Sequence, residues 1–305
     1  MPLSVSPVVP GELLPAVRWL FAAVPEADRE GRVERFTGLV TSGEIDPGGL
    51  LLAKRNGTPV GAAVVQVLPG GSAVVVPPSP EGGEVADALA AATVDFLRKS
   101  PAVIAHLFLD PSEVSKAAPL LRHGFRSAAA ITHMLRDLEH LPPPPRHLTL
   151  IPSVADPVLF GETLLATYID SLDVPEANTD RRADAILSGY LPGQPDSPHW
   201  WLARDSAGTP VGLVILIPPR FSPTWELGYL GVVPAARGNG YGTMLLRFAL
   251  HTARELGATH LTLSVDTRNE PALAVYRGHG FRSFQEQRVF LWRRDGFHSY
   301  PFPPS

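Results

Sequence analysis

The chain has 305 residues, of which 45% are hydrophobic and 18% are charged, and its formal net charge is −4. This length allows two domains of ordinary size, and the composition is globular rather than disordered. The small negative charge provides no general attraction to nucleic acid or to an anionic membrane. The chain contains no cysteine, which excludes disulfides, thiolate metal sites and a cysteine acyl-enzyme.

The chain also lacks the sequence features of membrane proteins. The first residues have neither the basic start nor the unbroken apolar run of a signal peptide. No segment approaches the roughly 18 apolar residues that a membrane-spanning helix needs.

The histidines show no metal-ligand spacing. We therefore expect a soluble cytoplasmic protein with no metal and with neither nucleic acid nor membrane as a partner; the oligomeric state is left open.

The first half of the chain shares two segments with the second. Residues 52–61 predict a strand, a tight turn and a second strand, and a similar Gly-Thr-Pro segment recurs at residues 202–212. The sequence Gly-Phe-Arg-Ser occurs at residues 124–127 and again at 280–283. Two matches in the same order at nearly the same offset indicate a duplication.

The boundary between the two halves is predicted at Pro142 to Pro145. Four consecutive prolines cannot continue a helix or a sheet ladder. We therefore expect a domain over residues 1–140, a proline linker over 141–146 and a second domain over 147–305.

The second half predicts strands and helices in alternation. The apolar patterns and turn residues place strands at 148–151, 200–203, 211–217, 227–233, 261–265 and 288–292, and helices at 157–168, 181–190, 241–256 and 271–277. Strands before and between helices are typical of an α/β or α+β domain. The same order of elements is expected in the first half.

A glycine-rich turn joins the strand at 227–233 to the long helix that follows it. The turn has the sequence Arg237-Gly238-Asn239-Gly240-Tyr241-Gly242-Thr243. Glycines let the backbone approach a ligand closely, and the N–H groups at a helix start attract an anion. Arg237 adds a positive charge, so the turn predicts a cradle for a pyrophosphate. A turn without a ligand, or a Rossmann-type loop, would share part of this pattern.

A second motif follows the strand at 261–265, and together the two motifs resemble a known family. The GCN5-related N-acetyltransferases (GNAT) have the coenzyme motif Arg/Gln-x-x-Gly-x-Gly/Ala, which Arg237, Gly240 and Gly242 match. Their later motif Asn-x-x-Ala-x-x-x-Tyr-x-x-x-Gly-Phe is matched by Asn269, Ala272, Tyr276, Gly280 and Phe281. The resemblance implies two tandem GNAT-like domains, each a mixed, mostly antiparallel sheet flanked by helices.

The same resemblance implies how acetyl-CoA would bind as the acyl donor. The coenzyme would lie where the strand at 227–233 parts from the strand at 261–265. Backbone groups near Val232 and Val233 would hold the pantetheine arm and the thioester carbonyl, while Asn269 would contact the coenzyme. Tyr276 would protonate the departing thiolate. The N–H groups that would bind the pyrophosphate belong to Gly238, Asn239, Gly240, Tyr241, Gly242 and Thr243.

The acceptor side is predicted from acidic residues. Glu226 lies on the same strand as Val232, and strict alternation would place residues 226, 228, 230 and 232 on one face, so Glu226 is a candidate general base. Asp170, Asp173 and Glu176 follow three-residue steps that suit a cationic or polyhydroxylated acceptor. An ordinary exposed glutamate and a solvated acidic face are the alternatives.

The first half lacks the coenzyme motif. In the alignment of the repeats, Pro80 stands opposite Arg237, and Val85 stands opposite Gly242. Glu81 and Glu84 fall where phosphate would bind and would repel it. We therefore expect residues 1–140 to be a degenerate GNAT-like copy that supports the second domain or shapes its acceptor site.

The sequence thus predicts an N-acetyltransferase that transfers an acetyl group from acetyl-CoA to a primary amine of a small molecule in a ternary complex. A mycothiol-synthase-like or longer-chain acyltransferase is one alternative. A non-catalytic acyl-CoA-binding sensor is another, and the first half could also act as a module that recruits a protein substrate.

Overall fold

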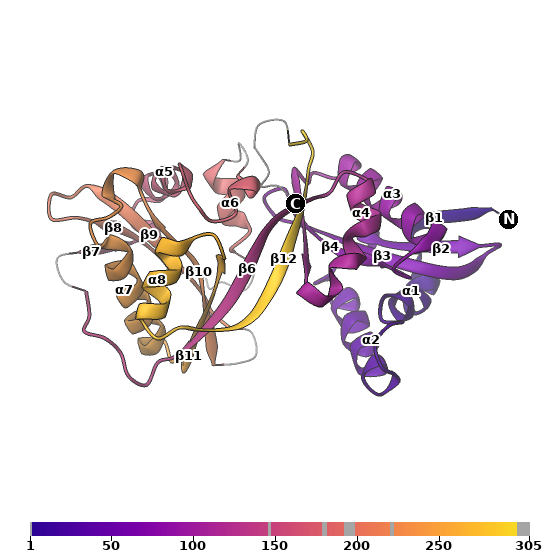
Figure 1. Cartoon of the computed structure of the whole chain (residues 1–305), viewed down its shortest axis with the longest axis horizontal. Coiled ribbons are helices and arrows are strands. Elements are labelled where there is room, and N and C mark those ends of the chain that lie inside the picture. The colour runs from indigo at the N-terminus through magenta and orange to yellow at the C-terminus, as the bar shows by residue number, and fades with distance from the viewer. Residues whose placement is uncertain (1, 146–147, 179–181, 192–198, 220–222, 298–305) are drawn as a thin grey trace. The chain divides into compact units, whose positions relative to one another are not determined.

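A computed structural model describes residues 2–145, 148–178, 182–191, 199–219 and 223–297. These residues form two compact units (Figure 1). The first unit consists of residues 1–128 and 288–305, and the second of residues 129–287. None of the helices in these ranges is long and apolar enough to cross a membrane.

The first unit is a mixed sheet between two pairs of helices. Its strands follow the order β1-β2-β3-β4-β5-β12, and all neighbours are antiparallel except the parallel pair β4 and β5. Figure 1 shows α1 and α2 on one side of these strands and α3 and α4 on the other. The elements are β1 (Leu3–Pro7), α1 (Leu13–Leu20), α2 (Glu26–Thr41), β2 (Leu50–Arg55), β3 (Thr58–Leu68), β4 (Ser72–Ser79), α3 (Gly83–Lys99), β5 (Ile104–Leu109), α4 (Ala118–Arg122) and β12 (Arg282–Arg293).

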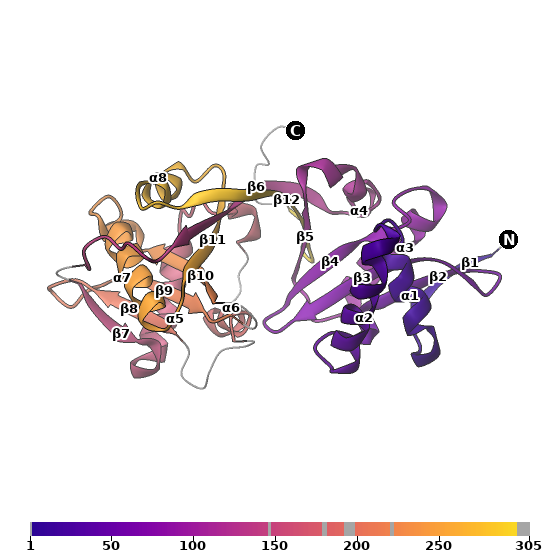
Figure 2. The same ribbon diagram turned by 90° about the horizontal axis from the view of Figure 1, so that it is seen from below.

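The second unit repeats this plan. Its strands follow the order β7-β8-β9-β10-β11-β6, with β10 and β11 as the parallel pair. In Figure 2, α8 lies on the opposite side of these strands from α5 and α6. The elements are β6 (Arg126–Asp137), β7 (Thr149–Pro152), α5 (Pro157–Tyr168), α6 (Ala183–Ser188), β8 (Trp200–Arg204), β9 (Pro210–Ile217), β10 (Thr224–Val232), α7 (Tyr241–Glu255), β11 (His260–Asp266) and α8 (Glu270–Gly278).

Two separate apolar layers hold the second unit together. On one face, α7 packs Leu245, Ala249 and Leu250 against strand residues that include Leu261 and Leu263. On the other face, α5 and α6 cover a second cluster that is built on strands β8 and β9: Phe160, Leu164, Ile186, Trp200, Leu202, Leu213 and Ile215. Alternate strand residues point to opposite faces, so one sheet supports both layers.

The predicted elements of the second half are confirmed to within three residues, except that the strand predicted at 288–292 is β12, which begins at Arg282. The helix expected at 241–256 is α7, which begins after Gly240 and ends before Gly257, a glycine with a φ of 90°. The helix expected at 181–190 is α6, although residue 181 lies outside the described residues. The mixed, mostly antiparallel sheet flanked by helices is also confirmed.

The two units exchange their last strands. Strand β6 comes from the first half of the sequence, but its residues 131–137 pair with β11 of the second unit. Strand β12 comes from the second half, and its residues Arg288 to Arg293 pair with β5 of the first unit. Phe290 and Trp292 of β12 enter the core of the first unit. Each compact unit therefore depends on residues from both halves.

The proline run does not separate these units. Pro142 to Pro145 have no regular secondary structure and belong to the second unit, where the carbonyl of Pro142 is 2.8 Å from Nε2 of His251 on α7. Residues 146 and 147 lie outside the described residues. The boundary at 141–146 stays a prediction about the repeat in the sequence, whereas the compact units divide at residues 128/129 and 287/288.

Candidate active site

A cavity of about 600 Å³ opens in the second unit where the two parallel strands part. Strands β10 and β11 pair only from Thr224 to Glu226, opposite His260 to Thr262. Beyond this point, residues 227–232 form one wall of the cavity, and residues 263–265 form the other. The predicted gap between these strands is therefore present.

The glycine-rich turn closes one end of the cavity. Gly238 and Gly240 have φ angles of 79° and 82°, which side chains other than glycine rarely adopt. The helix that follows makes its first backbone bond from Met244 N–H to Gly240 O, at 3.1 Å. The preceding N–H groups have no acceptor within the helix, so the turn presents donors and the positive end of a helix dipole to an anion.

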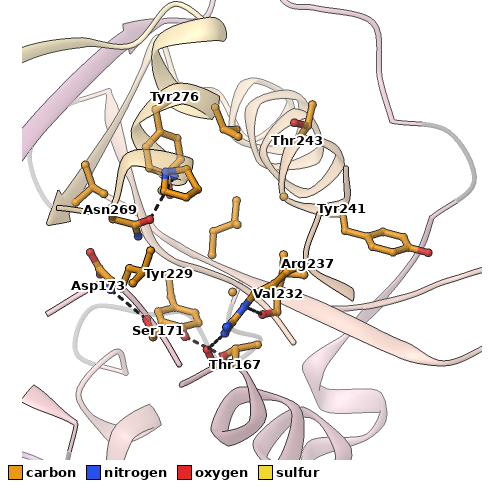
Figure 3. Close-up of a pocket in the computed structure, with 18 of the residues that line it drawn as sticks. Thr167, Ser171, Asp173, Tyr229, Val232, Arg237, Tyr241, Thr243, Asn269 and Tyr276 are labelled. Carbon is orange, nitrogen blue, oxygen red and sulfur yellow. Dashed lines mark hydrogen bonds between the residues drawn. The ribbon is translucent and has the colours of Figure 1, made fainter. Parts of the chain in front are cut away.

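Arg237 has a structural role that its sequence position did not predict. Its guanidinium donates to the carbonyls of Thr167, Ile169 and Asp170 at 2.6–3.1 Å, and its Nε donates to Val232 O at 3.1 Å. Figure 3 shows the guanidinium directed toward Thr167. Arg237 lines the cavity, but these four bonds fasten the end of α5 to β10. Direct contact between its charge and a pyrophosphate stays a prediction.

Tyr276 on α8 borders the cavity and is 9% exposed. Its ring packs against Phe281 at a centroid distance of 5.9 Å, and Figure 3 shows it near Asn269. Burial, together with the Asp173 carboxylate, raises the pKa of the Tyr276 hydroxyl. The phenol therefore stays protonated at neutral pH and can act as a proton donor.

Asn269 and Ala272 of the second motif shape the start of α8. The Asn269 side chain caps the helix, because its Oδ1 accepts from Ala272 N–H at 3.3 Å. Both residues border the cavity. Contact of Asn269 with a coenzyme stays a prediction.

Most residues predicted in the first motif border the cavity, and two do not. Val232, Gly238, Gly240, Tyr241, Gly242 and Thr243 line it. Val233 instead donates to Val211 O at 3.0 Å, and the Asn239 amide donates to the carbonyls of Ala236 and Arg237 at 3.3 Å. These two residues hold the shape of the turn.

The predicted face of Glu226 is wrong, because β10 contains a bulge. Glu226 pairs with Ile217 and Leu227 with Leu216, but Tyr229 pairs with Ile215, which leaves Gly228 as the extra residue. One extra residue reverses the alternation. Glu226 therefore shares a face with Tyr229 and not with Val232.

The bulge leaves Glu226 at the point where β10 and β11 part. Glu226 is exposed and precedes the first wall residue, Leu227. Although the residue keeps exposed surface, the protein atoms around its carboxyl exclude part of the water and raise the pKa of that group, and the nearby His133 opposes the shift. A raised pKa suits a group that must accept a proton near neutral pH.

The acidic residues after α5 do not form a row on a helix. The helix ends at Tyr168, and Asp170 and Val174 have positive φ angles of 52° and 42°. Asp170 and Asp173 border the cavity. Glu176 is 2% exposed and points to the interior, so the expected three-residue row is broken.

A cluster of two buried carboxylates and a partly exposed arginine, which the sequence did not reveal, fixes this loop. Arg268 donates to both oxygens of Glu176 at 2.7 and 2.9 Å, and its nearest bond to Asp266 is 2.6 Å. Asp266 is fully buried. It also accepts from Val174 N–H at 3.1 Å, and its own N–H donates to Asp173 at 2.8 Å. The cluster ties residues 173–176 to the end of β11.

The corresponding turn of the first unit carries acidic residues in ion pairs. Glu81 lies 3.0 Å from Lys116, and Glu84 lies 2.6 Å from Arg55. These carboxylates stand just before and within the first turn of α3, where a coenzyme phosphate would need positive potential. The geometry agrees with a copy that lacks the coenzyme motif.

Comparison with known proteins shows which family this part of the chain resembles. Residues 166–281 match the profile of the Acetyltransferase (GNAT) family. The solved GCN5-related N-acetyltransferase from Sphaerobacter thermophilus superimposes with a TM-score of 0.62 over 96% of each chain, at 21% identity. A tandem GNAT protein from the clavulanic acid biosynthesis pathway gives a TM-score of 0.51 over 96% of this chain and 99% of that one, at 19% identity. Residues 166–281 are therefore similar to the GNAT acetyltransferase family, and the chain has the fold of tandem GNAT proteins.

A curated relative points to a more particular similarity. The mycothiol acetyltransferase of Jonesia denitrificans is 33% identical over 137 residues, which cover 44% of this chain and 44% of that protein. The matched segment thus spans less than half the length of this relative.

Proposed function

We propose that this protein is an N-acetyltransferase that transfers the acetyl group of acetyl-CoA directly to a primary amine of a small molecule. The observation that carries this proposal is the cavity between β10 and β11, with anion-binding N–H groups at one end and Tyr276 on its wall. An acyl transfer of this kind needs a held donor, a base for the amine and an acid for the thiolate.

The donor half of the reaction follows from the cavity. The turn from Gly238 to Thr243 would bind the pyrophosphate through its N–H groups. The pantetheine arm would lie along the β10 wall near Val232. Backbone N–H groups freed where the strands part are suited to polarise the thioester carbonyl.

The chemical step needs two proton transfers. The neutral amine attacks the thioester carbon, and the tetrahedral intermediate then expels the thiolate. Glu226 is the candidate base, because it stands where the strands part and its pKa is raised. Tyr276 would give its proton to the sulfur, and its raised pKa keeps that proton available. The products are an amide and CoA.

The acceptor is proposed from the acidic residues that border the cavity. Asp170 and Asp173 border the cavity and would favour a cationic or polyhydroxylated amine. A mycothiol-type acceptor is the second candidate, and the similarity to mycothiol acetyltransferases supports it. Residues 1–140 would then support the second unit or shape its acceptor site rather than bind a second coenzyme.

The test is the release of CoA from acetyl-CoA with a panel of primary amines. The chain has no cysteine, so a thiol-reactive dye reports released CoA without a background from the protein. We expect turnover with at least one cationic or polyhydroxylated amine, and less of it in Glu226→Gln. Binding of acetyl-CoA without release for any acceptor would favour the acyl-CoA sensor instead.

A further inference from the structure

The strand that the first half gives to the second unit carries a histidine next to the cavity. His133 lies on β6, opposite Ser264 of β11 in the antiparallel pairing. Its Nδ1 is 2.8 Å from the Ser264 hydroxyl. Ser264 is exposed and lines the cavity between Leu263 and Val265. His133 thus reaches the cavity through one hydroxyl group.

The second ring nitrogen of His133 is also held. Its Nε2 is 3.0 Å from Oε1 of Gln287 on β12. A carbonyl oxygen can only accept, so Nε2 carries the hydrogen, and Nδ1 is free to accept from the Ser264 hydroxyl. In the resulting chain of hydrogen bonds, Ser264 donates to His133 and His133 donates to Gln287. It orients the imidazole to take a proton from the side of the cavity.

Glu226 belongs to the same face of the sheet. Glu226 pairs with Thr262 on β11, and Thr262 and Ser264 are two residues apart and so point to the same side. His133 therefore contacts the hydroxyl of Ser264 on β11 and, on β12, the amide of Gln287 and the ring of Phe284. It also interacts electrostatically with Glu226 on β10. Its one charged neighbour among these groups is negative and would stabilise an imidazolium.

We propose that Ser264 and His133 form the proton relay for the acceptor amine. The attacking amine gives a proton to Ser264 Oγ while the hydroxyl proton of Ser264 passes to His133 Nδ1. One N–H bond and one O–H bond break, and one O–H bond and one N–H bond form. Tyr276 supplies the separate proton that the leaving thiolate takes up. Gln287 holds the ring. In this relay His133 replaces Glu226 as the group that takes up the proton, and the carboxylate of Glu226 acts only through its negative charge, which stabilises the imidazolium. This inference rests on the proposed acetyl transfer.

The relay also gives the first half of the sequence a part in the reaction. Without β6 the second unit would keep its turn, Tyr276 and Glu226 but would lose His133. The degenerate copy would then contribute a functional group to the site of the other copy.

The experiment compares the full-length protein with His133→Gln and Ser264→Ala. Glutamine keeps hydrogen-bonding capacity at position 133 but cannot take up a proton. His260→Gln is the matched control, because His260 lies on the same face of β11 and outside the cavity wall. The measurements are kcat and kcat/KM for CoA release as a function of pH, and acetyl-CoA affinity by calorimetry.

We expect His133→Gln to lower kcat by roughly 100-fold or more, as for loss of a general base, with acetyl-CoA affinity unchanged. The dependence of kcat/KM on pH should differ between the wild type and His133→Gln, because the glutamine side chain carries no titratable group. Ser264→Ala should lower kcat in the same way, and His260→Gln should behave like the wild type.

Three outcomes would overturn the relay. The first is a wild-type rate in His133→Gln. The second is a lowered rate with an unchanged pH profile, which would make the histidine a structural residue. The third is a change of the pH profile in Glu226→Gln but not in His133→Gln, which would make Glu226 the direct base. If the wild type itself releases no CoA with any amine, the proposed function fails together with the relay.

Discussion

Replacing Arg268 by methionine should destabilise the second unit and weaken coenzyme binding. The guanidinium bonds to Glu176 and Asp266, whose side chains are 3% and 0% exposed. Removing one partner of a fully buried ion pair costs about 3–5 kcal/mol, but the Arg268 side chain is 38% exposed, so water screens part of its charge. We therefore expect a loss of about 1.5–3 kcal/mol, as for hydrogen bonds to charged groups. For a unit of this size the melting temperature should fall by roughly 3–12 °C. The loop that includes Asp173 would also lose its attachment to β11.

The assay is thermal and urea unfolding of the full chain, followed by calorimetry with acetyl-CoA. Arg182→Met is the matched control, since Arg182 pairs with Asp184 on the surface, at 85% and 70% exposure. Such a pair contributes less than about 1 kcal/mol. Arg268→Lys should fall between the two, because lysine keeps the charge but not the paired geometry. The reasoning is refuted if Arg268→Met unfolds at the same temperature as the control.

Three further changes test the site. Tyr276→Phe should lower kcat for CoA release by about 10²–10⁴-fold and leave the affinity for acetyl-CoA unchanged; equal rates would remove the role of Tyr276 as the acid. Because the pKa of the Tyr276 hydroxyl is raised, the kcat of the wild type should not fall on the alkaline side below about pH 10. Arg237→Lys should weaken acetyl-CoA binding in calorimetry as much as Arg237→Met, if the role of Arg237 is to hold the site together through its four bonds to carbonyl groups. Retained affinity in the lysine variant would instead favour direct contact of the positive charge with the pyrophosphate. Gly231→Ala should lower the free energy of unfolding in urea by about 1–3 kcal/mol, because a Cβ at this position would lie 2.7 Å from side-chain atoms of Thr167 and Tyr229. If the variant were as stable as the wild type, these neighbours would have to shift at no cost.

Local features of the sequence predicted local features of the structure well. The apolar periodicity of α7 and the prolines and glycines around it placed the helix within a residue of its observed end. The two motifs placed Tyr276, Asn269 and the turn at Gly240 around one cavity. Each of these depends on neighbours within a few positions along the chain.

The features that the sequence did not predict depend on partners far along the chain. The bulge at Gly228 is fixed by the register of β10 against β9, and it moved Glu226 to the other face. The burial of Glu176 depends on Arg268, 92 positions later. The repeat indicated two similar halves, but nothing in it shows which copy of the last strand completes which sheet.

The exchanged strands also limit how the protein can be cut. Removing residues 1–140 to test the first half would take β6 from the second unit as well, together with the seven residues that pair with β11. A test of the first half by deletion would therefore have to retain residues 129–140.

The exchange of β6 and β12 further determines the order in which the protein can be completed on the ribosome. Residues 1–128 emerge before the second unit, but Phe290 and Trp292, which are 3% and 4% exposed in the finished core of the first unit, are translated after it. Until then the free side of β5 is an unpaired strand edge beside an incomplete core, which favours binding to other chains. We expect the exposed edge of β5 in this nascent intermediate to be protected throughout the synthesis of the second unit, either by a chaperone or by temporary pairing with β6.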